Sequence, residues 1–504
     1  MSGVPAVVVA APASGSGKTT LATGLIGALR RAGYRVAPFK VGPDYIDPGY
    51  HGLAAGRPGR NLDPVLVGAE RVPALYRHGS RGCDLAVVEG VMGLFDGRID
   101  ESAGPIAEGS TAQVAGILGA PVVLVVDARG HSQSLAALLH GFATYDSGVR
   151  LGGVILNRVG SARHEQVLRS ACERVGLPVL GALPRLAELE LPSRHLGLIP
   201  AVEHGAPARA AVAAMTDLVA AHVDLAAVAA LAGAAVAGEA WDPAAALREA
   251  VAALGGRPEG SPGGGPPLTA EQGDSARTPT GGARLAAWSP AAAEHAAPVV
   301  AIAGGAAFTF GYAEHRELLE AAGARVEVFD PLHDPLPPGT AGLVVPGGFP
   351  EEHAERLAAN TPLLDEVAAL AAAGLPVHAE CAGLLYLARS LDGHRMAGVI
   401  DADAEFGPRL TLGYRDAVAL ADSPLWRAGQ RVRGHEFHRT RLLRTGAPVR
   451  AWGWRGSDGS PVTEGAVTHA VHASYLHTHP AGDPAAIARF TAAATAFAAT
   501  RIDA

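Results

Sequence analysis

Short apolar runs alternate with stretches of helical spacing along most of this chain, and this rhythm limits the folds that it can adopt. In the N-terminal part the apolar runs, each expected to form a strand, are Ala6–Ala11, Arg35–Val41, Leu85–Val91, Pro121–Ala128, Gly152–Val159 and Pro178–Leu183. Helical spacing is seen between several of them, at Lys18–Ala32, Leu135–Ala143 and His164–Val175. Buried strands that alternate with helices predict a doubly wound parallel sheet, which binds ligands at the carboxyl ends of its strands.

The rhythm stops at residues 256–286, where a run rich in Gly, Pro and polar residues cannot bury apolar surface. We expect a flexible linker there. From Pro298 strands are expected at Val299–Ala303, Arg325–Phe329, Leu343–Val345 and Val377–Ala379, and a helix near Glu314–Ala322. The prediction is two parallel-sheet α/β domains: 1–200, an Ala-rich helical segment at 201–255 that belongs to the first domain or packs on it, a linker at 256–297, and a second domain at 298–504.

Composition excludes several classes of function. The 504 residues have a net charge of −8, so the chain lacks the basic excess that nucleic acid binding needs. Cys83, Cys172 and Cys381 are too few and too scattered for a disulfide framework or a zinc site, which fits a reducing cytosol. No run reaches the ~18 apolar residues of a membrane span, and the apolar start lacks the basic region of a signal peptide. We expect a cytoplasmic protein that binds neither nucleic acid nor membrane.

A phosphate-binding loop is predicted at Ala13-Ser-Gly-Ser-Gly-Lys-Thr-Thr20, directly after the first strand. Backbone N–H groups of such a loop surround phosphates, Lys18 reaches the terminal phosphates, and the Thr19 hydroxyl binds Mg²⁺. The full pattern requires a glycine where this chain has Pro12. A glycine-rich turn that binds no nucleotide is the alternative.

Charged residues follow the second predicted strand, in the segment Phe39–His51. Lys40, Asp44 and Asp47 stand where a parallel sheet binds ligands. A turn-rich surface loop with solvated charges is the alternative.

Glu89 ends the third predicted strand, and a carboxylate there is costly unless it meets a metal or a partner. It is therefore a candidate Mg²⁺ ligand, with a buried ion pair as the alternative. Asp96, on the following loop, faces the same crevice. Asp127 at the end of the next strand is a rival metal ligand, and Asn157 could bind a nucleotide base or cap a helix.

A strand–turn–helix elbow is predicted at Pro376–Leu387, where an apolar run leads into Cys381 and then into a helical run. A nucleophile at such a turn is held away from the backbone. The helix N-terminus favours its thiolate, and small Ala382 and Gly383 leave room for a substrate. A buried structural cysteine is the alternative.

A cysteine nucleophile also needs oxyanion donors and a base. Gly347 and Gly348, in the segment Val345–Glu351, let backbone N–H groups point at an oxyanion. The candidate bases, all near Tyr475, are His472, His477 and His479.

These motifs resemble two known kinds of domain. The resemblance to the class I glutamine amidotransferase domain rests on Val345–Glu351, Val377–Tyr386 and Tyr475–His477. The N-terminal motifs resemble the dethiobiotin-synthetase-like P-loop fold. Both together, with Lys40–Pro48 and Leu191–Pro200, are similar to the cobyrinate or hydrogenobyrinate a,c-diamide synthase family of cobalamin biosynthesis. The similarity covers nearly the whole chain except about 205–297.

The resemblance implies a role for each matching residue. Cys381 would attack the glutamine amide and His477 would be its base, with the amides of Gly348 and Ala382 as the oxyanion hole. The implied ATP contacts are Gly15, Ser16, Gly17, Lys18, Thr19, Thr20, Lys40 and Asn157. The implied Mg²⁺ ligands are Thr19, Asp44 and Glu89, and the implied substrate or synthetase contacts are Asp44, Tyr45, Asp47 and Asp96.

One departure concerns the base. Many relatives have Glu two residues after it, but this chain has His479 there. A Cys–His dyad is therefore expected, and whether His479 assists His477 is left open.

The implied reaction is amidation of the a- and c-acetate carboxylates of a corrinoid, with ATP, glutamine and Mg²⁺. An acyl phosphate would form first, and ammonia released from glutamine would then attack it, passing between facing domains. Amidation of another tetrapyrrole, of the nickel-sirohydrochlorin or cobyric acid synthase type, is one alternative. A P-loop switch ATPase that performs no synthesis is another, and it would need no glutaminase. Cobalt in the ring, the order of amidation and a homodimer are left open.

Overall fold

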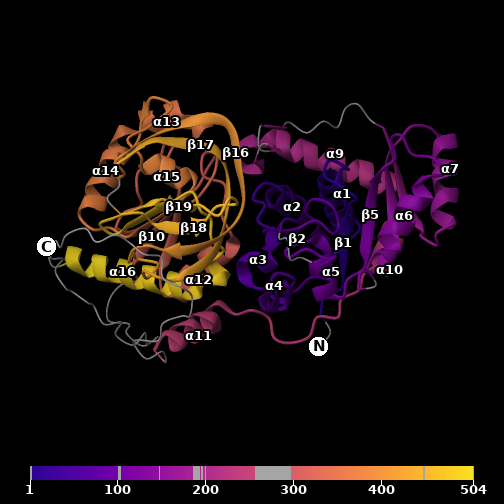
Figure 1. Ribbon diagram of the computed structural model, residues 1–504, viewed down its shortest axis with the longest axis horizontal. Helices are drawn as coiled ribbons and strands as arrows, with labels where there is room; N and C mark the ends of the chain where they lie inside the picture. Colours follow the sequence, from indigo (N-terminus) through magenta and orange to yellow (C-terminus); the bar gives the residue numbers. More distant parts are fainter. Residues whose placement is uncertain are drawn as a thin grey trace.

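The structure, a computed structural model, describes residues 3–99, 104–146, 148–185, 193–194, 197–198, 200–255, 297–446 and 449–502. Two α/β halves lie side by side, the N-terminal one in indigo and magenta and the C-terminal one in orange and yellow (Figure 1). The predicted linker at 256–297 lies outside the described residues except for Ala297, and so does half of Leu191–Pro200. No helix in these described ranges is long and apolar enough to cross a membrane.

A seven-stranded parallel sheet forms the core of the N-terminal half, in the order β3-β2-β4-β1-β5-β6-β7. The strands are β1 (Ala6–Ala10), β2 (Val36–Val41), β3 (Arg60–Leu62), β4 (Leu85–Glu89), β5 (Val122–Asp127), β6 (Leu151–Val159) and β7 (Val179–Pro184). The six predicted strands are confirmed, and the three-residue β3 is the addition. Lys40 on β2 pairs in register with Glu89 on β4, so both stand at the carboxyl edge of the sheet.

Helices cover this sheet, which explains why its strands are apolar throughout. The helices of residues 3–255 are α1 (Lys18–Arg31), α2 (Asp47–Ala55), α3 (Pro64–Val67), α4 (Val72–Gly79), α5 (Thr111–Leu118), α6 (Leu135–Thr144), α7 (Ala162–Glu173), α8 (Ala201–His204), α9 (Ala206–His222), α10 (Leu225–Leu231) and α11 (Pro243–Gly255), of which α11 packs on the other half instead of on this sheet. Helix α9 packs closely on α1. A Cβ on Gly24 would lie 2.4 Å from Met215 O, so this contact requires glycine.

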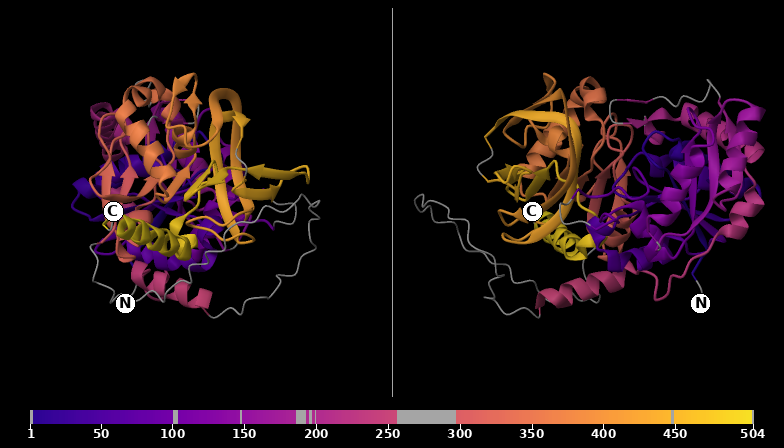
Figure 2. Two further views of the ribbon diagram at one scale, coloured as in Figure 1. Left: turned by 90° about the vertical axis from the view of Figure 1, so that its left-hand side faces the viewer. Right: turned by 45° about the vertical axis from the view of Figure 1, so that its right-hand side comes forward.

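The helical segment predicted at 201–255 contacts both halves of the molecule. Helix α9 packs on the N-terminal half, whereas α11 packs against α12 (Ala313–Ala321) and α16 (Pro484–Ile502) of the C-terminal half. Both views show α11 beneath the C-terminal half (Figures 1 and 2). The expectation that the whole segment packs on the first domain is therefore met by α9 and not by α11.

A six-stranded sheet, in the order β11-β10-β12-β13-β21-β20, forms the core of the C-terminal half. Its strands are β10 (Val299–Ala303), β11 (Arg325–Phe329), β12 (Thr340–Val345), β13 (Val377–Glu380), β20 (Ala466–Thr468) and β21 (Val471–Ser474). All pairs are parallel except β20 with β21. The remaining helices are α13 (Ala354–Ala359), α14 (Thr361–Ala372) and α15 (Ala382–Leu387).

A second sheet in the C-terminal half goes beyond the predicted pattern. It comprises β14 (Ser390–Leu391), β15 (His394–Arg395), β16 (Ala402–Ala419), β17 (Arg431–Thr445), β18 (Trp452–Arg455) and β19 (Pro461–Glu464). The long antiparallel hairpin of β16 and β17 contains many charged residues, so its strands do not read as apolar runs. In Figure 1, β16 runs along the side of this half that faces the N-terminal half.

Polar contacts hold the two halves together. Arg60 of β3 lies 2.6 Å from Glu314, and His78 lies 3.0 Å from Glu317 on the same helix α12. From the hairpin, the Tyr414 hydroxyl donates to Asp63 at 3.0 Å. These contacts fix the position of one half relative to the other, so the sites of the two halves can be described together.

Candidate active sites

The glycine-rich loop after β1 has the backbone that close approach to a phosphate requires. Gly15 and Gly17 have φ of +77° and +94°, values that side chains disfavour. A Cβ on Gly17 would lie 2.3 Å from Nδ2 of Asn157. The predicted loop conformation is confirmed, directly before α1.

Two neighbouring residues of β6, Asn157 and Arg158, hydrogen-bond to this loop. The Asn157 side chain donates to Ser16 O at 2.9 Å. Arg158 donates to Gly15 O at 3.0 Å and forms an ion pair with Asp127 at 2.5 Å. Asn157 therefore holds the loop in place, and Asp127 is engaged by arginine, which leaves its rival role as a metal ligand without support.

Lys18 connects the loop to the segment that follows β4. Its Nζ donates to Met92 O at 2.5 Å, and burial together with nearby Lys40 lowers the pKa of Lys18. Asp96 accepts from the Gly93 N–H at 3.0 Å and so shapes the same segment. The predicted residues Lys18 and Asp96 thus belong to one crevice.

Five side chains converge at the carboxyl edge of β1, β2 and β4. Lys40 Nζ lies 2.7 Å from Asp47 and 3.0 Å from Glu89, and His51 Nε2 lies 2.7 Å from the other oxygen of Glu89. The Thr19 hydroxyl donates to Glu89 at 2.7 Å. Burial acts to raise the pKa of Glu89, but Lys40 and His51 hold it below its usual range. Sequence reasoning assigned no role to His51, although it closes the segment that contains Lys40.

Asp44 and Asp47 have different positions from those expected. Asp44 Oδ1 accepts from the backbone N–H groups of Ile46 and Asp47, at 2.8 and 2.9 Å, and so starts α2. Asp47 Oδ2 instead lies 3.2 Å from the Thr19 hydroxyl. The geometry therefore favours Asp47, rather than Asp44, as the second carboxylate beside Glu89.

The oxygen atoms of Thr19, Asp47 and Glu89 are of the hard type that Mg²⁺ prefers. In the part of the chain that the structure describes, no group of three or more His, Cys, Asp or Glu side chains could hold a metal ion. A magnesium ion usually takes one or two carboxylates and completes its shell with phosphates and water. The residues present fit a magnesium ion that arrives with ATP.

Cys381 forms the predicted elbow between β13 and α15. Its φ of +50° and ψ of −99° lie outside the regions that side chains favour. Its N–H donates to Ser474 O at 2.7 Å, and the Ala382 N–H donates to its sulfur. A Cβ on Gly383 would lie 2.0 Å from Val345 O, which explains the glycine there.

The Cys381 thiol is buried, at 3% exposure, and this changes one expectation. Burial and the Glu351 carboxylate raise its pKa, and Glu380 and Glu436 add to the effect. The expectation that the helix N-terminus favours the thiolate is wrong here, because these effects outweigh the Ala382 amide. The raised pKa favours the thiol over the thiolate, so Cys381 needs a base when it attacks.

His477 follows β21, the strand that pairs in parallel with β13 at Glu380 and Ser474. It is fully buried, and neither ring nitrogen has a hydrogen-bond partner among the described residues. A Cβ on Gly347 would lie 2.4 Å from its Cε1. His477 therefore lies at the same sheet edge as Cys381 and against the predicted oxyanion loop.

The other two candidate bases have different surroundings. His472 lies within β21 against Trp452, and burial, with nearby His378, lowers its pKa to about 3. His479 Nδ1 accepts from the Ala481 N–H at 3.2 Å. Of the three, His477 has the ring nitrogens free to move a proton.

Tyr45 connects the two sites. It belongs to the loop between Lys40 and Asp47, yet its ring centroid lies 5.1 Å from that of His477. It also stacks on Phe310, at 5.1 Å and an interplanar angle of 11°. The two sites were predicted to face each other, and the contact between these rings agrees with that prediction.

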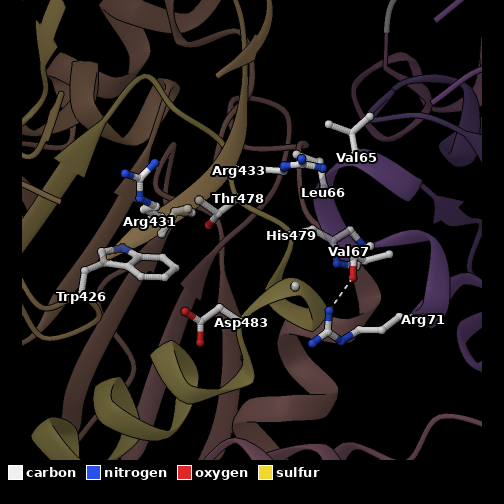
Figure 3. Close-up of a pocket in the computed structure, with 13 residues that line it drawn as sticks. Val65, Leu66, Val67, Arg71, Trp426, Arg431, Arg433, Thr478, His479 and Asp483 are labelled. Atoms are coloured by element: carbon white, nitrogen blue, oxygen red, sulfur yellow. Dashed lines mark hydrogen bonds between the residues drawn. The ribbon is translucent and has the colours of Figure 1, made fainter. Parts of the chain in front are cut away.

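A cavity of about 280 Å³ lies between the halves and has arginines on both sides (Figure 3). Arg71, beside α3, lines it from the N-terminal half. Arg431 and Arg433 of β17 line it from the C-terminal half, together with Trp426 and Thr478. The cavity is suited to an anionic group.

Comparisons with known proteins agree with both halves. Residues 7–199 match the family described as "CobQ/CobB/MinD/ParA nucleotide binding domain", and residues 299–485 match "CobB/CobQ-like glutamine amidotransferase domain". The hydrogenobyrinate a,c-diamide synthase of Mycobacterium bovis is 59% identical, over 97% of this chain and 98% of its own. That of Streptomyces coelicolor is 56% identical, over 97% of each chain. The cobyrinate a,c-diamide synthase of Gloeobacter violaceus is 40% identical, over 94% of this chain and 93% of its own.

Proposed function

The chain belongs to the family of hydrogenobyrinate and cobyrinate a,c-diamide synthases, glutamine-dependent amidating ligases of cobalamin biosynthesis, and on that basis we propose that its substrate is hydrogenobyrinate. The relatives named for hydrogenobyrinate that are cited above are 59% and 56% identical, against 40% for the one named for cobyrinate. This difference supports the metal-free ring as the substrate.

The N-terminal site activates a carboxylate with ATP. A carboxylate does not react with ammonia directly, because hydroxide is a poor leaving group. Its oxygen attacks the γ-phosphorus of ATP, ADP leaves, and an acyl phosphate forms. Lys18 and the loop amides stabilise the charge that develops on the phosphates. A magnesium ion held by Thr19, Asp47 and Glu89 would supply further positive charge there.

The C-terminal site releases ammonia from glutamine. The Cys381 sulfur attacks the side-chain amide while His477 takes the thiol proton and passes it to the departing nitrogen. Ammonia and an enzyme thioester result, and water then hydrolyses the thioester to glutamate. The amides of Gly348 and Ala382 stabilise the oxyanion.

The single observation that supports the coupling of the two reactions is the packing of Tyr45 on His477. Ammonia that met water would be protonated and would lose its nucleophilicity. The contact brings the synthetase loop against the glutaminase base, so that ammonia is released close to the acyl phosphate. Ammonia then displaces phosphate, and the amide forms.

The arginines that line the cavity in Figure 3 are the proposed contacts for peripheral carboxylates of the corrinoid. The chain as a whole has a net charge of −8, so an anionic substrate needs local positive charge of this kind. Both Arg431 and Arg433 are exposed on β17. Arg433 also forms ion pairs with Glu108 at 2.7 Å and Asp416 at 3.3 Å, so Arg431 is the proposed first contact for a carboxylate.

The deciding experiment offers the purified protein ATP, Mg²⁺, glutamine and either hydrogenobyrinate or cobyrinate, and weighs the products. We expect hydrogenobyrinate to lose two carboxyl groups to amides, at a higher kcat/KM than cobyrinate. A higher kcat/KM with cobyrinate would overturn the proposed substrate.

A further inference from the structure

Hydrolysis by a cysteine and a histidine works best when a third group fixes the histidine ring and stabilises its charged form. The position two residues after His477 cannot supply it, because His479 is not a carboxylate. Its ring instead packs on Tyr312 at 4.1 Å and caps a turn at Ala481. A carboxylate that orients His477 would therefore have to come from another part of the fold.

Glu380 is a largely buried carboxylate, 12% exposed, beside both residues of the dyad. It ends β13, directly before Cys381, and its Oε2 lies 3.7 Å from His477 Nδ1. Its Oε1 accepts from the N–H and the hydroxyl of Thr478, at 3.0 and 2.8 Å. One carboxylate oxygen thus anchors the residue after the base, and the other faces the base.

We propose that Glu380 is the positioning residue of the glutaminase site and holds His477 so that Nε2 receives the proton of Cys381. The inference rests on the proposed function of the C-terminal half. In this arrangement Nδ1–H points at Glu380 Oε2, and the imidazolium that forms during attack is stabilised by the carboxylate. The proton then passes to the departing ammonia, so Glu380 itself neither gains nor loses one.

The ring nitrogens of His477 support this arrangement. Neither has a hydrogen-bond partner among the described residues, so no competing acceptor fixes the tautomer. The distance of 3.7 Å exceeds that of a hydrogen bond, and such contacts shorten when substrate closes a site. Glu380 therefore has the geometry of an acceptor that is engaged during the reaction.

The charge on Glu380 also fits the role. Burial acts to raise its pKa, but His378, at 3.2 Å, and His477 hold it well below its usual range. Several other ionisable groups face this pair from the elements packed around it. They are Tyr45 from the synthetase loop, Tyr312 and His315 at α12, His435 from β17, His472 and His479 at and after β21, and Cys381. The pair thus comprises an ionised carboxylate and a base beside a protonated thiol.

The test replaces Glu380 by Gln in the full-length protein and measures two activities. Glutamate release should fall about 100-fold in kcat with little change in KM for glutamine. Amidation of the corrinoid with added ammonium should be retained, because it bypasses the cysteine. Loss of both activities together would make Glu380 a structural residue and overturn the proposal, as would glutamate release within threefold of wild type.

Two further variants separate positioning from packing. Glu380→Asp should recover part of the loss, because it restores the charge. His479→Gln should reduce glutamate release much less than Glu380→Gln does, and the reverse order would overturn the proposal. The rate at which iodoacetamide alkylates Cys381 should rise in Glu380→Gln at a fixed pH, because removing the carboxylate lowers the pKa of the thiol.

If the wild-type protein releases glutamate but amidates no corrinoid, the proposed function fails while the inference about Glu380 stands.

Discussion

The two sites solve opposite problems with buried polar groups. In the N-terminal site, Lys40 lies between Asp47 and Glu89, and His51 completes the pairing. In the C-terminal site, both nitrogens of His477 lack a hydrogen-bond partner among the described residues, and burial raises the pKa of the Cys381 thiol. A site that binds a nucleotide keeps its charges balanced until the ligand arrives. A site that moves a proton keeps its base unengaged.

The largest expected effect is that of Cys381→Ala, which tests whether the two sites are separable. Glutamine-dependent diamide formation should fall at least ~10³-fold, because the nucleophile is gone. Formation of the diamide with added ammonium should remain near the wild-type rate. Both rates are measured by the mass of the corrinoid product. Loss of both in a folded variant would show that the two sites do not act separately.

The reciprocal change is Glu89→Gln, which unbalances the paired charges of the N-terminal site. Corrinoid-dependent ATP hydrolysis should fall about 100-fold, because the variant lacks the negative charge that would hold Mg²⁺ beside the phosphates of ATP. Glutamate release from glutamine should persist. Phosphate release measures the first activity, and an unchanged rate would show that Glu89 has no part in the phosphoryl transfer.

A smaller effect is expected from Tyr45→Ala, which removes the ring shared by both sites. Each site keeps its own reactive groups, so both half-reactions should survive. The ratio of glutamate released to amide formed should rise several-fold, because ammonia escapes to water. A ratio that stays at the wild-type value would exclude Tyr45 from the transfer.

The contact between the halves gives a prediction about pH. Burial acts to raise the pKa of Glu317, but His78 and Arg60 outweigh it and lower the pKa to about 2. A lowered pKa stabilises the fold above the usual value of about 4.5, and the contribution is lost as the pH falls from about 4.5 to 2. Glu317→Gln should therefore lower the free energy of unfolding at pH 7 by on the order of 1 kcal/mol, as measured in urea. The difference from wild type should shrink as the pH falls below 5, and a constant difference would contradict the ion pair as its cause.

The smallest expected effect is that of Arg431→Ala in the cavity between the halves. Exposed charge contacts contribute up to about 1 kcal/mol, so KM for the corrinoid should rise about two- to fivefold. KM for glutamine and for ATP should not change. Steady-state kinetics with each substrate varied in turn would show it, and an equal rise for all three would point to a general loss of structure.

Much of both sites follows from local patterns in the sequence. The loop at Gly15 to Thr19, the elbow at Cys381 and the choice of strands are each determined by neighbouring residues, and the structure agrees with them. The sequence could not show that Asp47, rather than Asp44, lies beside Glu89, because both residues follow the same strand. Only the start of α2 decides which of them faces Thr19.

Other features depend on contacts between segments far apart in the chain. The packing of Tyr45 on His477 and the reach of the β16–β17 hairpin leave no local signal. Glu380 is different, because it ends a buried strand just as Glu89 does. The argument that made Glu89 a candidate, the cost of a carboxylate at the end of such a strand, applies equally to Glu380 and would have identified it.

The left-handed backbone at Cys381 lowers the stability of the fold, although the cysteine is required for glutaminase activity. A non-glycine residue in such a conformation costs on the order of 1 kcal/mol or more, which glycine would not pay. Cys381→Gly should therefore be inactive with glutamine and yet harder to unfold than the wild type. Chance mutation toward glycine would be tolerated in a lineage supplied with ammonia, and only the need to use glutamine would keep the cysteine in place.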